Sequence, residues 1–338
     1  MSAAASTETV APLLSVEHLR IVAAARRRED LLVEDVSFAV HAGEFLGIVG
    51  ESGCGKSMTA LSMLGLLPGP NVRASGGRVL FDGQDILTMG GSSLRHLRGN
   101  DVAMIFQDPM SSLNPVQTIG EQIVETILLH EKIGRERAWA RAVELLAEVN
   151  IPAAAQRARD YPHQLSGGMR QRVMIAMAIA CKPRLLIADE PTTALDVTIQ
   201  AQILELLDRL RRERGMAVIL ITHDLGVIAE YADRVLVMYS GRIVERAEVA
   251  SLFAQPLHPY THGLLGSVPP LEEEVDELVA IEGQPPSPGA WPSGCRFQPR
   301  CPQSRPECAS WSVRLIESEP DHAAACILHE HGETSHAD

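Results

Sequence analysis

Short apolar segments alternate with longer amphipathic segments along the first 250 residues of the chain. Five segments rich in Val, Ile and Leu are typical of buried parallel strands, and they cover residues 45–49, 102–106, 185–188, 218–221 and 235–238. Between the second and the third, residues 108–182 carry helical patterns, such as the one at 135–149, and no convincing strand. The alternation predicts an α/β fold with a largely parallel sheet and a helical insertion.

The pattern changes after Gly241, where Pro and Gly become frequent and an acidic run precedes a group of cysteines. This composition is typical of an extended, turn-rich segment rather than of more sheet. We therefore divide the chain into a flexible N-terminal tail at 1–12, a main domain at 13–254 and a C-terminal extension at 255–338.

Composition narrows the classes of function. The 338 residues are 46% hydrophobic and 22% charged, as in a folded globular protein. The net charge of −13 and the aromatic content of 4% disfavour nucleic acid as a partner. No apolar run reaches the roughly 20 residues of a membrane span, and the N-terminus lacks the basic and apolar regions of a secretory signal. We expect a cytosolic location.

A glycine-rich motif follows the first predicted strand and precedes a helical pattern. It fits G-x4-G-K-S, in which backbone N–H groups surround phosphates, the lysine adds a point charge and the serine hydroxyl ligates Mg²⁺. The alternative is a chance glycine-rich turn, which the strand and helix on either side disfavour. The predicted ATP-binding residues here are Gly50, Glu51, Ser52, Gly53, Cys54, Gly55, Lys56, Ser57 and Met58.

Two carboxylates end the predicted strand at 185–188, at the sheet edge where ligands of open α/β folds bind. Asp189 is the candidate ligand of Mg²⁺, and Glu190 the candidate base for the attacking water. Taken alone, the pair would be an ordinary acidic turn. Beside a phosphate-binding loop, it predicts nucleotide hydrolysis, with Lys56 and Glu190 among the catalytic residues.

A third motif, Leu165-Ser166-Gly167-Gly168-Met169, opens a strongly helical stretch and offers a second helix N-terminus, with bare N–H groups and a capping Ser, for phosphate. Alone it would be a Ser-capped helix. With the other motifs, the chain resembles the nucleotide-binding subunits of ATP-binding cassette (ABC) transporters, whose signature is L-S-G-G-Q. Met169 replaces the usual Gln, a mild departure because Ser166, Gly167 and Gly168 would make the phosphate contacts.

The resemblance implies a P-loop NTPase ABC cassette: a RecA-like core, an antiparallel β region, a helical subdomain at about 108–182 and the Cys-containing extension. It also implies a dimer in which each phosphate loop faces the partner's signature. Further residues match single family motifs. Gln107 corresponds to the Q-loop glutamine that senses Mg²⁺ and the γ-phosphate, Ala194-Leu195-Asp196 to the D-loop, and His223 to the switch histidine that contacts the γ-phosphate.

One family feature is absent. The aromatic residue that stacks on adenine in this family corresponds to Ala23, and no Phe, Tyr or Trp occurs before residue 38. Aromatic stacking contributes about 0.5–1.5 kcal/mol beyond buried area. We therefore expect weaker binding or looser selection of the base, without loss of phosphate chemistry.

Two further stretches resemble the dipeptide and oligopeptide importers. One is the segment 108–115 after Gln107, and the other is the extension, with His258-Pro259-Tyr260-Thr261 and a later Gly294-Cys295-Arg296-Phe297. The resemblance implies an ATPase (translocase) peripheral to the cytoplasmic face of the inner membrane. Its implied partners are two permease subunits, a second ATPase, preferably a paralogue, and, indirectly, a periplasmic or lipid-anchored solute-binding protein. Import of nickel or another small solute is the nearer alternative, and a soluble ABC ATPase of translation or repair the more distant one.

Four cysteines are gathered in the extension with the spacing C-x5-C-x6-C-x17-C. The spacing matches neither a ferredoxin run nor a compact zinc ribbon, so by itself it leaves the cofactor open. Resemblance to importer ATPases with this extension implies a structural [4Fe–4S] cluster, with zinc or no metal as alternatives. The implied ligands are Cys295, Cys301, Cys308 and Cys326.

Overall fold

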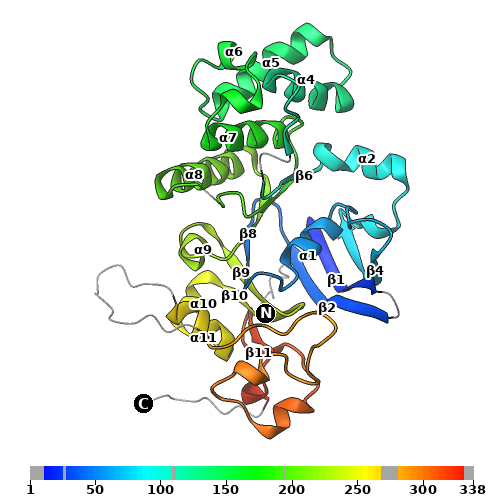
Figure 1. The fold of residues 1–338 in the computed structure, drawn as a ribbon, viewed down its shortest axis with the longest axis vertical. Helices are drawn as coiled ribbons and strands as arrows, with labels where there is room; N and C mark the ends of the chain where they lie inside the picture. The colour runs from blue at the N-terminus through cyan, green and yellow to red at the C-terminus, as the bar shows by residue number, and fades with distance from the viewer. Residues whose placement is uncertain (1–10, 26–27, 109–111, 194, 268–280, 331–338) are drawn as a thin grey trace, which may run out of the picture.

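An eight-stranded sheet forms the centre of the protein. The structure, a computed structural model, describes residues 11–25, 28–108, 112–193, 195–267 and 281–330 (Figure 1). The strand order is β11-β12-β10-β9-β3-β8-β7-β6; the five strands from β9 to β6 are parallel, and the other three continue the sheet antiparallel. The strands are β3 (Phe45–Val49), β6 (Val102–Ile105), β7 (Leu185–Asp189), β8 (Ala217–Thr222), β9 (Arg234–Tyr239), β10 (Arg242–Glu248), β11 (Ile316–Glu319) and β12 (His322–Ala324).

The five predicted parallel strands are confirmed, each within one residue at either end. Every residue of β3, β7 and β8 is buried, because helices or other chain segments cover both faces of the sheet. Their sequences are continuous apolar runs for this reason. The parallel arrangement brings the carboxyl ends of β3, β6, β7 and β8 to one edge, where the predicted site residues begin.

A second, four-stranded antiparallel sheet has the order β2-β1-β4-β5 and lies beside α1 in Figure 1. It confirms the antiparallel β region that the resemblance implies. Its apolar side chains, such as Leu14, Val36 and Val40, are fully buried against the central sheet and α1. The strands are β1 (Leu14–Ala25), β2 (Arg28–Val40), β4 (Val72–Phe81) and β5 (Gln84–Asp85).

The predicted helical insertion is confirmed and forms the upper part of the molecule in Figure 1. Its helix α4 begins in a capping box, in which Thr118 and Glu121 each accept a backbone N–H of the other. The helices of the insertion are α4 (Ile119–His130), α5 (Arg135–Glu148), α6 (Ala154–Arg157) and α7 (Gly167–Ala178). The others are α1 (Lys56–Ser62), α2 (Gly91–Asn100), α8 (Val197–Arg214), α9 (Leu225–Tyr231), α10 (Val249–Ala254) and α11 (Pro259–Gly266).

No helix in the described ranges has both the length and the apolar character needed to cross a bilayer. The tail predicted at 1–12 lies outside the described residues except for residues 11 and 12.

The C-terminal extension contradicts one expectation, because it contributes strands to the central sheet. β12 pairs with β10 through Glu245↔Ala324 and Arg246↔Ala323, and β11 pairs with β12. The carboxylate of Glu245 fixes this junction: it accepts backbone N–H groups from Leu257 and His258 at 2.8 and 2.9 Å and lies 2.8 Å from His322 Nε2. A three-residue strand such as β12 is too short to give a period, so the sequence pattern could not predict it.

Candidate functional site

The glycine-rich loop connects β3 to α1, as its sequence predicts. Gly50 has φ +151°, and a Cβ there would lie 2.2 Å from the carbonyl oxygen of Met238, so the close approach excludes any side chain. Gly55 has φ +106° and is the N-cap of α1, where no side chain accepts the first N–H groups. The backbone donors at the start of α1 therefore remain open for an anion.

Lys56 is held inside this loop by the loop's own carbonyl groups. Its ammonium donates to Gly50 O at 2.6 Å and to Glu51 O at 3.1 Å, and the residue is 5% exposed. Cys54 Sγ lies 3.7 Å from the same nitrogen, and burial raises the pKa of its thiol. The loop thus holds a buried positive charge. Of the remaining loop residues, Ser52 and Gly53 are exposed, Ser57 is partly buried, and Met58 packs towards the core of the antiparallel sheet.

Asp189 and Ser57 together fit a magnesium site. Burial raises the pKa of the Asp189 carboxyl, and this effect is opposed by a hydrogen bond from the Ser57 hydroxyl, which places the two side chains together. Asp189 Oδ1 is fully buried without a hydrogen-bond partner. Mg²⁺ prefers oxygen ligands, and the Asp189 carboxylate and the Ser57 hydroxyl supply them close to Lys56. A bound Mg²⁺ would also give the buried Asp189 Oδ1 the partner that it lacks.

Glu190, Gln107 and His223 lie together at the carboxyl ends of three adjacent strands. Glu190 Oε2 accepts a hydrogen bond from Gln107 Nε2 at 2.8 Å and another from Thr193 Oγ1 at 3.0 Å. Glu190 Oε1 lies 3.7 Å from His223 Nδ1. The second carboxylate oxygen is therefore free of a close donor and can accept a proton.

The signature residues are placed elsewhere. Ser166 caps α7, and its hydroxyl accepts the N–H of Met169 at 3.3 Å, while Asp196 caps α8. Gly168 lies against Ile199 of α8, where a Cβ would meet its side chain at 2.8 Å. Figure 1 shows α7 and α8 in the upper region, away from α1. A single chain does not bring Ser166, Gly167 and Gly168 to the phosphate loop.

The four cysteines of the extension line one closed cavity, together with residues such as His258 and Trp311. Burial and the nearby thiols of the other three cysteines together raise the pKa of the Cys326 thiol to about 11. The cavity of about 20 Å³ has room for about one water molecule. In the part of the chain that the structure covers, no three His, Cys, Asp or Glu residues are grouped to hold a metal ion. The predicted cluster is not confirmed. Its implied ligands are Cys295, Cys301, Cys308 and Cys326.

Three residues that contact predicted site residues were not singled out in the sequence. Thr193 is hydrogen-bonded to Glu190, and Tyr260 and Arg300 of the extension contact Glu51 of the phosphate loop. Tyr260 lies within the His-Pro-Tyr-Thr segment that resembles the oligopeptide importers. Neither Tyr260 nor Arg300 could be assigned to the phosphate loop, because each is more than 200 residues away from it in the sequence.

Comparison with known protein families decides the identity. Residues 33–193 match the model described as "ABC transporter", and residues 244–308 match "Oligopeptide/dipeptide transporter, C-terminal region". The chain belongs to the ABC transporter family. It is an ATP-binding subunit of the oligopeptide/dipeptide importer branch, an ABC ATPase that couples ATP hydrolysis to transport.

Curated relatives match this ABC ATPase over almost its whole length. The oligopeptide transport ATP-binding protein AppD of Bacillus subtilis is 48% identical, and the match covers 94% of this chain and 97% of the relative. The protein OppD of Salmonella typhimurium, also described as an oligopeptide transport ATP-binding protein, is 50% identical, with 95% and 96% covered.

A solved dimeric structure of the ATP-binding cassette MJ0796 bound to ADP and phosphate is also similar. Its TM-score is 0.61 at 27% identity, over 70% of this chain and 98% of that one. The part of this chain that matches is therefore as long as a whole cassette, and the C-terminal extension lengthens the chain beyond it.

Proposed function

We propose that this ABC ATPase drives the import of short peptides. ATP hydrolysis is supported by one observation: Glu190, Gln107 and His223 lie together at the carboxyl edge of the central sheet, beside the open N-terminus of α1. The peptide substrate is supported by the match to the extension's family model and by the oligopeptide transport named for AppD and OppD.

Each site residue has a role that follows from its position. The N–H groups of the loop at 50–58 bind the β- and γ-phosphates, and Lys56 adds its charge. Ser57 and Asp189 would hold Mg²⁺, with Gln107 as a further ligand; the ion would neutralise phosphate charge. Glu190 takes the proton of the attacking water through Oε1, and His223 contacts the γ-phosphate.

The site is completed by a second cassette. Ser166, Gly167 and Gly168 form the start of α7, which lies away from α1 of the same chain, so the phosphate that they contact comes from the site of a partner ATPase. Asp196, next to α7, would lie at the same interface. A paralogous partner would give a heterodimer with two permease subunits, on the cytoplasmic face of the membrane, and a solute-binding protein outside.

A groove beside Gln107 supports a permease contact. It has a volume of about 540 Å³ and lies between the core and the helical region, lined by residues such as Phe106, Leu113, Met174 and Met177. Phe106 is 40% exposed, directly before Gln107. We propose that a cytoplasmic helix of a permease subunit occupies it, so that movement of the helical region reaches the membrane subunits. Of the predicted segment 108–115, residues 109–111 lie outside the described part.

The cysteine cavity is the remaining candidate cofactor site. Its four thiols are a donor set that serves either a [4Fe–4S] cluster or a zinc ion, and the resemblance to importer ATPases with this extension favours the cluster. Because the cavity has a volume of about 20 Å³, it would have to widen to hold a cluster. Iron and sulfide assays on anaerobically purified protein test this directly, and absence of both elements refutes it.

The proposed function is tested by trapping the assembled transporter. The Glu190→Gln variant with Mg²⁺ and ATP should remain bound to its partners in detergent-solubilised membranes. Recovery of two permeases and a second ATPase supports the importer, and competition of labelled peptide uptake by unlabelled peptides, but not by Ni²⁺, identifies the solute class. Recovery of ribosomal or DNA-associated proteins alone would overturn the proposal.

A further inference from the structure

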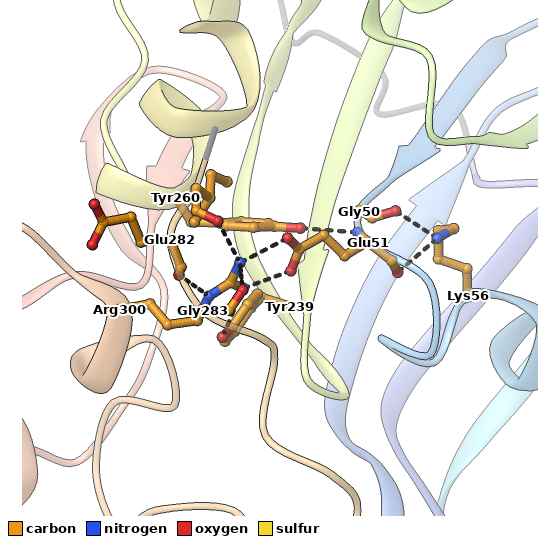
Figure 2. Close-up of polar contacts among 9 residues, drawn as sticks. Gly50, Glu51, Lys56, Tyr239, Tyr260, Glu282, Gly283 and Arg300 are labelled. Atoms are coloured by element: carbon orange, nitrogen blue, oxygen red, sulfur yellow. Dashed lines mark hydrogen bonds and ion pairs between the residues drawn. The ribbon is translucent and has the colours of Figure 1, made fainter. Parts of the chain in front are cut away.

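Glu51 of the phosphate loop is fixed on both sides of its backbone. Its N–H donates to the hydroxyl of Tyr260 at 2.9 Å, and its carbonyl oxygen accepts from Lys56 Nζ at 3.1 Å. Figure 2 shows Glu51 between the extension on one side and Lys56 on the other. Because Lys56 also binds Gly50 O, the start of the loop is connected to the extension through a continuous chain of hydrogen bonds.

The side chain of Glu51 is held by a buried arginine of the extension. Arg300 donates from its two terminal nitrogens to the two carboxylate oxygens of Glu51, at 2.7 and 2.9 Å. The Arg300 side chain is 5% exposed, so this two-point ion pair is largely removed from water. Such paired geometry is the strongest that an arginine and a carboxylate can form. The hydrogen bonds to Glu51 raise the pKa of the Arg300 guanidinium.

The remaining donors of Arg300 anchor it within the extension. Its Nε–H donates to Glu282 O at 2.9 Å, and further N–H groups reach the carbonyl oxygens of Ile281 and Gly283 and the hydroxyl of Tyr239, each at 3.3 Å. Arg300 therefore cannot follow the loop freely. Its position is determined by the segment at 281–283 and by β9.

Tyr260 is equally fixed. It is fully buried in α11 and packs against Tyr239 and Phe297, with ring centroids 4.7 and 5.4 Å away. Its hydroxyl thus presents a rigid acceptor to the N–H of Glu51. Without that acceptor, a partly buried backbone donor would lack a partner, and the loop would relax to satisfy it.

The charges explain why this contact bears on ATP. Glu51 places a carboxylate in a loop whose ligand is a polyphosphate, and like charges at close range oppose binding. Arg300 compensates that charge and directs the carboxylate away from Lys56, as Figure 2 shows. Deleting Arg300 would leave the carboxylate uncompensated and free to approach the phosphate site.

We propose that Tyr260 and Arg300 are positioning residues for ATP binding, through which the C-terminal extension holds the phosphate loop in its binding conformation and cancels the charge of Glu51. The inference rests on the proposed ATPase function. It has a reciprocal consequence: if the extension favours the binding conformation, bound ATP must stabilise the extension by the same free energy.

The test uses the full-length protein in its transporter complex and compares the KM for ATP with kcat. We expect Arg300→Gln to raise KM at least tenfold and Tyr260→Phe to raise it about threefold to tenfold, with kcat changed less than twofold in each. The double variant Glu51→Gln/Arg300→Gln should return KM to within about threefold of the wild-type value, because the unpaired charge is gone. Arg300→Lys should fall between the wild type and Arg300→Gln.

Matched controls come from the same protein. Arg314→Gln changes an arginine of the extension that pairs with Glu330, and Tyr231→Phe removes a hydroxyl from α9; both should leave KM unchanged. A second readout is hydrogen exchange: ATP should slow exchange in α11 of the wild type and do so less in Tyr260→Phe.

The outcomes separate the two proposals. A wild-type complex without ATPase activity refutes the proposed function itself. An active wild type with KM unchanged in Arg300→Gln, or a raised KM that Glu51→Gln does not rescue, overturns the positioning role. If Arg300→Gln does not fold, Tyr260→Phe decides: KM unchanged in Tyr260→Phe refutes the inference.

Discussion

Replacing Glu190 with glutamine tests the proton-accepting role proposed for this side chain. Both hydrogen bonds that Glu190 receives, from Gln107 and Thr193, end on Oε2, which the amide oxygen of glutamine can replace. The amide nitrogen then takes the place of Oε1, which faces His223 at 3.7 Å without a close donor. The substitution therefore keeps the local contacts and removes only the oxygen proposed to take the proton.

The expected loss follows from that geometry. General base catalysis contributes about 10²- to 10⁴-fold, so kcat should fall by this factor, equivalent to about 2.7–5.5 kcal/mol. ATP binding should change less than about threefold, because neither the loop at 50–58 nor Asp189 is altered.

Phosphate release by the purified complex, together with equilibrium binding of ATP, measures both quantities. Glu125→Gln, an exposed carboxylate of α4, is the matched control and should be fully active. A kcat within threefold of the wild type would refute the assignment of Glu190 as the base, and a large loss of ATP affinity would show that the side chain acts in binding instead.

Three further predictions concern stability and nucleotide binding. Glu245→Gln should lower the free energy of unfolding at pH 7 by about 3–5 kcal/mol, because Glu245 is fully buried against His322. Burial raises the pKa of Glu245, but the hydrogen bonds from His322 and from the surrounding N–H groups outweigh this effect, so its pKa in the folded protein lies below the ordinary value of 4.5. The carboxylate therefore stabilises the fold above pH 4.5, and this contribution is lost as the pH falls through the lowered pKa. Chemical denaturation at pH 7 and at pH 4 should show that the difference in unfolding free energy between wild type and variant is smaller at pH 4. Gly50→Ala should weaken ATP binding at least tenfold, whereas Gly43→Ala, also at positive φ but with no atom within 4 Å, should bind ATP normally in the same titration. The wild type should bind ATP and GTP within a few-fold of each other, and Ala23→Tyr should strengthen ATP binding about twofold to tenfold through stacking; strong ATP preference in the wild type would contradict this.

The sequence predicted the parts of the fold that depend on local pattern. Strands such as β3 and β7 are continuous apolar runs because both faces are buried, and the loop after β3 follows a fixed motif. Gln107, Glu190 and His223 could also be predicted, since each lies within two residues of the end of a strand and parallel strands bring their carboxyl ends to one edge.

The contacts of the extension could not be predicted in this way. Arg300 and Glu51 are 249 residues apart, and nothing in the periodicity of either segment indicates the other. β12 is three residues long, and its pairing with β10 is determined by the buried carboxylate of Glu245 rather than by any repeat. Such tertiary contacts depend on the final packing, which local propensity does not encode.

On the proposed function, Gln107 gives a physical route from hydrolysis to the membrane subunits. Its amide is hydrogen-bonded to Glu190 at the reacting end of the site, and its backbone leads directly from β6 into the helical region. The preceding residue, Phe106, lines the groove proposed for a permease helix. A change at Glu190 when the γ-phosphate leaves would therefore act on the second residue of the connection from β6 to α4, and the groove lies next to that connection. The signature at Ser166 belongs to the same helical region. A movement of Gln107 after hydrolysis in one cassette would therefore also move the signature, which contacts ATP at the site of the other cassette. Coupling between the two ATP sites and coupling to the permease would then share one hydrogen bond.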